Sequence, residues 1–94
     1  MENAHPTDFK VGEIVISKAG RDSGRYFVVM WDKNEYLGLC DGDLRKTDKV
    51  KRKKKKHVKT TGRVCEYLNG KIESGAKVTN SELRRSISEL TADI

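Results

Sequence analysis

The sequence predicts a small, mainly β domain followed by a helical segment, and three observations support this fold class. Short apolar runs rich in β-branched residues recur about every ten positions between residues 11 and 60, as is typical of small antiparallel barrels or half-barrels. Turn-forming glycines and aspartates separate these runs. After residue 60 the apolar residues recur every three to four positions, which is the spacing of one helix face. A length of 94 residues allows one domain.

The first two strands are expected at residues 11–17 and 26–31. The first run alternates between the two faces of a strand, whereas the second is continuously apolar and has the length of a buried strand. A loop of Gly, Ser, Lys, Arg and Asp connects them. Gly20 and Gly24 are expected to shape this loop, because glycine accepts positive φ without a Cβ clash.

Three further strands are expected beyond a turn at residues 32–35. The pair Asp41-Gly42 predicts a tight hairpin, because both central positions of a type I′ turn need positive φ. A short strand should follow it, and Val58 is the apolar anchor of another within a lysine-rich stretch. These three strands are placed at residues 36–40, 44–46 and 54–59.

The core of this β domain is expected to come from the apolar residues of these strands. A chain of this size buries only about 60–65% of its unfolded surface, so a partner that binds the folded state would add to its stability. The expected core residues are Val15 or Ile14, Ile16, Phe27, Val29, Trp31, Leu37, Leu39 and Val58.

Two helices are expected after residue 60. Val64, Leu68 and Ile72 recur at four-residue intervals and suit a short helix capped by Thr60 or Thr61. The second helix has a clearer start, because residues 79–82 (Thr-Asn-Ser-Glu) fit a capping box. This helical pair packs either on the β domain or on a partner. The apolar stripe of the second helix consists of Leu83, Ile87, Leu90 and Ile94.

The composition favours an anionic partner. The net charge of +6 suits RNA, DNA, an anionic membrane surface or an acidic protein. No run of 18 apolar residues is present, so no membrane span is expected, and the N-terminus lacks the basic and apolar regions of a secretory signal. Cys40 and Cys65 are expected to be reduced thiols of a cytoplasmic protein.

The sequence carries no pattern typical of catalysis or of metal binding. His5 and His57 lack zinc-ligand spacing with respect to the two cysteines. The chain has no Walker loop, dinucleotide fingerprint or nucleophile elbow. We therefore expect neither enzymatic activity nor a cofactor nor a metal.

The basic residues are concentrated in one tract. Eleven of the twenty Lys and Arg residues lie between residues 45 and 63, where Asp48 is the only acidic residue. Localised positive charge is typical of proteins that bind a polyphosphate, and lysine favours backbone contacts over base reading. The alternatives are a solvated or disordered segment, protection of a sheet edge, and a nuclear-import signal at residues 51–56.

Residues 12–29 resemble the KOW motif of ribosomal proteins and transcription elongation factors. Residues 17–25, Ser-Lys-Ala-Gly-Arg-Asp-Ser-Gly-Arg, are the specific part, and Gly24 matches the key glycine of the motif. Residues 41–46 and 56–58 extend the similarity, so that it covers about residues 11–59. The chain is most similar to the family of the fourteenth large-subunit ribosomal protein of archaea and eukaryotes and to its small bacterial relatives.

The resemblance implies an SH3-like barrel that binds RNA, usually ribosomal RNA. It divides the chain into a polar tail (1–9), an SH3-like KOW barrel (10–60) and a helical appendage (61–94). A ribosomal or ribosome-associated protein of this kind would be cytoplasmic, monomeric when free, and in contact with large-subunit proteins. The implied RNA-binding residues are Lys18, Arg21, Arg25, Lys46, Lys51, Arg52, Lys53, Lys54, Lys55, Lys56, His57 and Lys59, with Gly20 and Gly24 shaping the loop.

Two other function classes compete with RNA binding. A protein-interaction adaptor would use the aromatic face or the apolar stripe of the last helix, and an exposed stripe would favour it. A DNA-binding transcription factor needs a recognition helix, for which Arg84 and Arg85 are too few basic residues.

Overall fold

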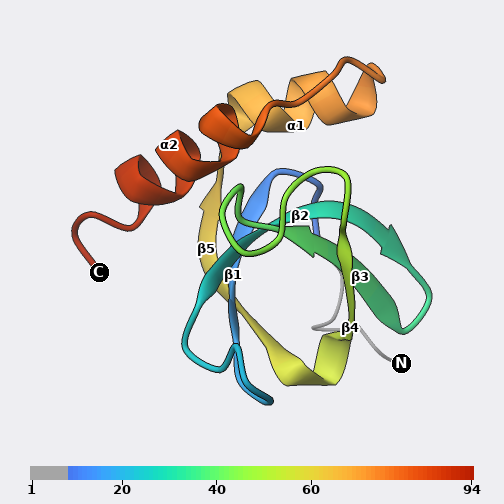
Figure 1. The fold of residues 1–94 in the computed structure, drawn as a ribbon, viewed down its shortest axis with the longest axis vertical. Coiled ribbons are helices and arrows are strands. Elements are labelled where there is room, and N and C mark those ends of the chain that lie inside the picture. The colour runs from blue at the N-terminus through green and yellow to red at the C-terminus, as the bar shows by residue number, and fades with distance from the viewer. Residues whose placement is uncertain (1–8) are drawn as a thin grey trace.

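The fold is a strongly curled five-stranded antiparallel sheet with two helices at one side (Figure 1). The computed structural model describes residues 9–94. Its elements are β1 (Glu13–Ser17), β2 (Tyr26–Lys33), β3 (Tyr36–Cys40), β4 (Lys51–Lys54), the 3-10 turn η1 (Lys55–His57), β5 (Val58–Val64), α1 (Glu66–Glu73) and α2 (Asn80–Leu90). The strand order is β4-β3-β2-β1-β5. The mainly β class with C-terminal helices is confirmed, and the predicted tail lies outside the described residues apart from Phe9.

The first three strands form where the sequence predicts them. β1 and β2 pair across the glycine-containing loop, with Val15 opposite Phe27. β2 continues beyond its predicted end, so that only Asn34 and Glu35 turn the chain into β3. Asn34 has a φ of 55°, a left-handed conformation that Asn tolerates because its short polar side chain hydrogen-bonds locally.

The predicted hairpin at Asp41-Gly42 and the strand at 44–46 are wrong. Residues 41–50 form an irregular connection between β3 and β4. The Asp41 carboxylate accepts the backbone N–H groups of Asp43 and Arg45 at 2.9 and 2.8 Å, which folds the chain into a local turn. Gly42 has positive φ, but it also lies against α2, where an added Cβ would be 2.3 Å from the carbonyl oxygen of Asn80.

The lysine-rich stretch forms two strands rather than one, which corrects the prediction at residues 54–59. β4 pairs with β3, the turn η1 follows, and β5 pairs with β1 as far as Val64. The first helix therefore begins at Glu66, with Cys65 as its N-cap, and not at Thr60 or Thr61. The two threonines are β-branched, so they suit the sheet, and Thr60 lies opposite Val15 of β1.

Apolar side chains form two clusters, one on each face of the sheet. The inner cluster is enclosed by the curled sheet, and the outer cluster lies between the sheet and the helices. The inner cluster comprises Val15, Phe27, Val29, Leu37, Leu39 and Val58, with Phe9 packed against it. The outer cluster comprises Ile14, Val28, Cys40, Leu68, Val78 and Leu83.

Most of the predicted core is confirmed, but Ile16 and Trp31 are only half-buried and belong to neither cluster. Ile16 lies two residues beyond Ile14 on the outer face of β1, where the helices do not bury it. For Trp31, a β-bulge between Val29 and Trp31 shifts the register with β3. The bulge places these two residues on opposite faces, whereas regular alternation would have kept both in the core.

The start of the second helix matches its prediction, but the helix ends at Leu90, before Ile94 of the predicted stripe. Thr79 and Glu82 form the reciprocal capping box, with hydrogen bonds of 3.1 and 2.9 Å. In its apolar stripe Leu83 is buried and Ile87 packs against the outer cluster, whereas Ile94 is exposed. The stripe is therefore packed on the sheet. Across residues 9–94, neither helix has the length and apolar character needed to cross a lipid bilayer.

Candidate nucleic-acid interface

The loop between β1 and β2, the turn η1 and β4 meet at one end of the sheet. The backbone N–H of Lys18 donates to the carbonyl of His57 at 2.8 Å. The ammonium group of Lys53 donates to the carbonyl of Ala19 at 2.8 Å. In Figure 1 these segments lie at the bottom of the view, and the helices lie at the top. This brings together basic segments that are more than thirty residues apart in the sequence.

The loop has a defined conformation. Gly20 and Gly24 have φ values of 86° and 90°, which confirms that both adopt the conformation expected of them. An added Cβ at Gly24 would meet no atom within 4 Å, so backbone conformation and not space requires the glycine. The N–H of Gly24 donates to the carbonyl of Ser17 at 2.8 Å and closes the loop.

Two lysines of the basic tract lie inside the molecule. The Lys53 ammonium group is 2.8 Å from the Asp22 carboxylate, and its side chain is 9% exposed. Lys55 is 2.6 Å from the Asp32 carboxylate, and its side chain is 10% exposed. This placement revises the prediction for these two lysines, because each neutralises a carboxylate of the fold instead of presenting its charge at the surface.

Asp22 is the centre of the internal charges. Burial acts to raise the pKa of this carboxyl group, but hydrogen bonds from Lys53 and Ser17 and the positive charges of Lys53 and Lys51 outweigh it. The net pKa is therefore lowered, and Asp22 is ionised at neutral pH. Lys51 is 3.9 Å from the same carboxylate and is partly buried. The acidic side chain of the loop is thus neutralised internally.

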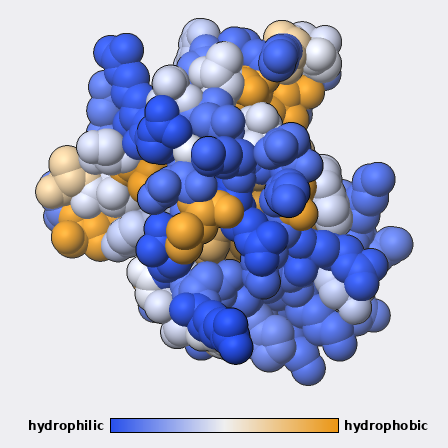
Figure 2. Space-filling view, viewed as in Figure 1, coloured by the Kyte–Doolittle hydropathy of each residue, from blue (hydrophilic) through white to orange (hydrophobic). Residues whose placement is uncertain are grey.

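The remaining cations of this end are exposed. Ion pairs between the described residues involve none of Lys18, Arg21, Lys56 or Lys59, and we call this set the basic end. Lys59 lies opposite Ile16 in the β1–β5 pair, next to the loop, and His57 is half-buried within η1. The lower part of Figure 2 is covered almost entirely by hydrophilic residues.

Two other predicted residues lie away from the basic end. Lys46 is exposed on the 41–50 connection. This connection lies next to α2, where the N–H of Thr47 donates to the side chain of Asn80 at 2.9 Å. Arg25 is exposed but faces Asp41 and Asp43, with N–O distances of 3.4 and 3.9 Å. Both lengths exceed those of a strong charge-assisted hydrogen bond.

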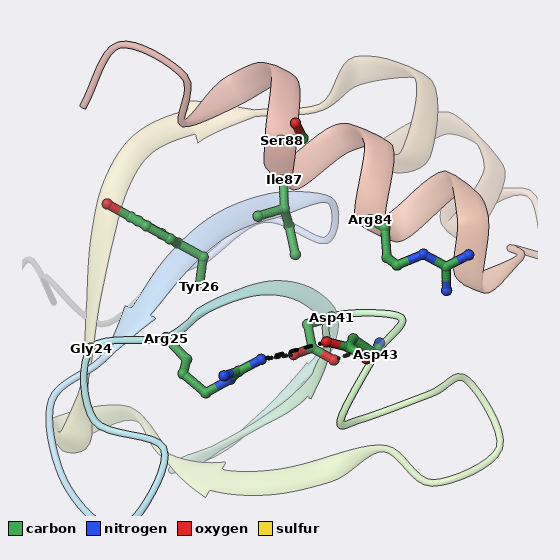
Figure 3. A pocket seen from close by; sticks show the side chains of 8 residues that line it. All are labelled: Gly24, Arg25, Tyr26, Asp41, Asp43, Arg84, Ile87 and Ser88. Carbon is green, nitrogen blue, oxygen red and sulfur yellow. Dashed lines mark hydrogen bonds and ion pairs between the residues drawn. The ribbon is translucent and has the colours of Figure 1, made fainter.

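Arg25 lines a pocket of about 390 Å³ between the start of β2, the 41–50 connection and α2. Figure 3 shows Arg25 reaching toward the two aspartates while Arg84 extends from α2. The Arg84 guanidinium donates to the carbonyl of Gly42 at 2.6 Å, so it fastens the helix to the connection. The lining of this pocket includes two arginines and two aspartates, so its charges give it no clear preference for an anion.

The predicted RNA-binding residues omit two aromatic residues on the outer face of β2 and β3. Trp31 and Tyr36 are half-buried there, outside both apolar clusters. Arg52 lies over the Tyr36 ring at 4.3 Å, and Lys33 over the Trp31 ring at 5.5 Å. The alternation of residues along β3 could have placed Tyr36 on this face. The bulge that places Trp31 there could not have been predicted, because a continuous apolar run gives no sign of a bulge.

The described part of the chain holds no cluster of three or more His, Cys, Asp or Glu side chains suited to a metal ion. Burial raises the pKa of the Cys40 thiol to about 11, so this group is protonated at neutral pH. No protein-family profile matches the chain, and no curated protein matches it in sequence.

Proposed function

We propose that this protein binds RNA without catalysing a reaction on it, and that the curled sheet is an SH3-like barrel presenting the basic end to phosphates. The observation that carries the proposal is the division of the basic tract into internal and exposed cations. Lys53 and Lys55 neutralise Asp22 and Asp32 inside the fold. The exposed cations therefore act on a partner with little opposition from nearby acids.

The arrangement of the basic end suits a phosphate backbone. Lys18 and Arg21 come from the β1–β2 loop, Lys56 from η1 and Lys59 from β5. Cations from three segments that are held together by backbone hydrogen bonds can contact neighbouring phosphates at the same time. The KOW-like loop sequence makes ribosomal RNA the RNA that we propose, with the protein acting in the cytoplasm beside large-subunit proteins.

Arg25 adds a cation that can exchange partners. Its side chain is 42% exposed, and both of its contacts with carboxylates are long. A phosphate can therefore take the place of the exposed Asp43 carboxylate without leaving a buried charge unpaired.

The adaptor alternative depends mainly on an exposed apolar stripe on α2, and this stripe is not exposed. The stripe of α2 packs against the sheet, with Leu83 fully buried. The large exposed apolar side chains of the described residues lie in three separate segments: Leu44 in the 41–50 connection, Tyr67 on α1, and Ile94 after the end of α2. Single exposed apolar residues are ordinary on protein surfaces and do not indicate a docking site.

The proposal is tested by the salt dependence of binding to a structured ribosomal RNA fragment. If about five cations meet phosphates, log Kd changes with log salt with a slope of about 3.5 to 4.5. The double variant Lys18→Gln/Lys56→Gln should weaken binding by about tenfold or more at 100 mM salt and reduce the slope by about 1.4 to 1.8.

The matched control removes the same charge elsewhere. Lys77 and Arg85 are exposed near and on α2, so Lys77→Gln/Arg85→Gln should leave the slope unchanged. Equal slopes for the two double variants would refute the basic end as the binding surface. Crosslinking in cells then identifies the RNA: reads at one ribosomal RNA site support the ribosomal assignment, and scattered reads contradict it.

A further inference from the structure

We infer that the outer face of β2, β3 and β4 is a stacking platform for unpaired RNA bases. This inference rests on the proposed RNA binding and adds the kind of RNA that is recognised. The platform consists of six cross-strand positions: Trp31, Lys33, Tyr36, Gly38, Arg52 and Lys54. We call it the aromatic–basic patch.

The register of the strands builds this patch in two rows. In the first row Trp31 of β2 lies opposite Gly38 of β3, which lies opposite Arg52 of β4. In the second row Lys33 lies opposite Tyr36, which lies opposite Lys54. Paired residues point to the same face of a sheet, so all six positions share the outer face.

The helices leave this part of the outer face uncovered. They bury Val28 and Cys40, which lie earlier on β2 and later on β3 in the same pair of strands. Trp31 and Tyr36 are in neither apolar cluster.

Gly38 allows the Trp31 ring to lie across the sheet. A Cβ added at Gly38 would be 2.2 Å from both Cε2 and Nε1 of Trp31 and 2.6 Å from Cδ1. Because these three ring atoms surround the position that a Cβ would take, the indole ring lies over the backbone of Gly38. One face of the ring then contacts the strand, and the other faces outward, as a base-stacking surface requires.

The charges around the rings select a polyanion. Lys33 lies 5.5 Å from the centroid of Trp31, and Arg52 lies 4.3 Å from that of Tyr36. None of the six positions is acidic. Bases stacked on the aromatic rings would bring their phosphates beside these cations, a combination typical of single-stranded nucleic-acid binding. A proline-rich peptide also binds aromatic surfaces, but it supplies no charge that the three cations would complement.

The test uses Trp31, which is the only tryptophan of the chain. An eight-nucleotide oligouridylate or oligoadenylate should quench Trp31 fluorescence saturably, whereas a blunt RNA duplex of equal length should not. Tyr36→Leu should weaken binding of the oligonucleotide at least about fivefold, which is the lower end of the stacking contribution of one base. The control Tyr67→Leu removes an aromatic residue of α1 that is 61% exposed and should have no such effect.

Each result has a distinct meaning. Salt-dependent binding of structured RNA, with unchanged Trp31 emission and equal affinities for the two leucine variants, would overturn the platform and leave the proposed function standing. Absence of binding to any RNA would overturn both. Quenching by a proline-rich decapeptide but by neither oligonucleotide would replace the nucleic acid with a peptide ligand and overturn the inference. Circular dichroism of both variants verifies that they are folded.

Discussion

Lys53 and Lys54 are neighbours in the sequence, but they lie on opposite faces of β4. Lys53 lies opposite Leu37 on the inner face, where its ammonium group contacts Asp22 and the carbonyl of Ala19. Lys54 lies opposite Tyr36 on the outer face, and no carboxylate of the described residues pairs with it. A run of like charges is therefore not one functional unit. When the run forms a strand, alternate members become part of the fold.

The internal members need partners, because a buried ammonium group is costly to desolvate. Lys53 has two partners at 2.8 Å, one of them charged. Its long apolar stem crosses the inner face while its charge neutralises Asp22. The outward members keep their hydration and remain available to a ligand.

The largest expected effect comes from removing the internal charge. Lys53→Ala leaves the Asp22 carboxylate without its closest cation, and we expect the free energy of unfolding to fall by about 2–4 kcal/mol. Lys54→Ala, its neighbour on the outer face, should change the free energy of unfolding by less than about 0.5 kcal/mol. Urea denaturation at pH 7 measures both. Equal losses for the two variants would contradict the division between faces.

The next effect concerns the outer face itself. Gly38→Ala places a Cβ inside the Trp31 ring, so the indole must move, at a cost of about 1–3 kcal/mol. The emission maximum of Trp31 should shift as the ring leaves the sheet. Gly70→Ala is the control, because this glycine of α1 has no atom within 4 Å of an added Cβ. The control should be stabilised by about 0.5–1 kcal/mol. An unmoved emission maximum in Gly38→Ala would contradict the position assigned to the ring.

The parts of the fold that depend on local sequence were predictable. The alternating and apolar runs located β1, β2 and β3, and the spacing of Thr79 and Glu82 located the start of α2. The positive φ of Gly20 and Gly24 also followed from the composition of their loop. Each of these features depends on residues within a few positions of one another.

The parts that depend on distant partners were not predictable. β4 contains only Lys and Arg, so its inward face becomes evident only through Leu37, Leu39 and Asp22. The bulge that moves Trp31 out of the core arises from its register with β3. For the candidate site, composition located the basic tract, but it could not separate the internal Lys53 and Lys55 from the exposed cations of that tract.

A smaller effect is expected in the pH dependence of stability, to which the surface carboxylate of Glu82 contributes. Glu82 accepts hydrogen bonds from the Tyr67 hydroxyl, the Thr79 backbone N–H and Lys71, which lower its pKa from 4.5 to about 2. Because the folded pKa is the lower one, this stabilisation is present above pH 4.5 and is lost as the pH falls toward 2. Glu82→Gln should therefore show a shallower loss of stability between pH 5 and pH 2 in urea titrations.

Asp22 provides the internal counterpart to Glu82. Its pKa is also lowered, so its contribution is likewise lost on acidification. Asp22→Asn, however, should destabilise the protein at pH 7 as well, because it leaves Lys53 buried without a charged partner. For Glu82→Gln, an unchanged dependence of the unfolding free energy on pH would contradict the stabilising role of the hydrogen bonds that Glu82 accepts from Tyr67, Thr79 and Lys71.

The smallest expected effect on stability should accompany a clear effect on binding. Lys54→Gln removes one outward cation of β4, so we expect an unchanged unfolding midpoint and a salt slope that is lower by about 0.7 to 0.9. Lys53→Gln should show the reverse: a large loss of stability and, at temperatures where it stays folded, the parental slope. Measuring both quantities for both variants separates the two faces of one strand. If Lys53→Gln lowered the slope as much as Lys54→Gln, the internal lysine would have to leave Asp22 when RNA binds.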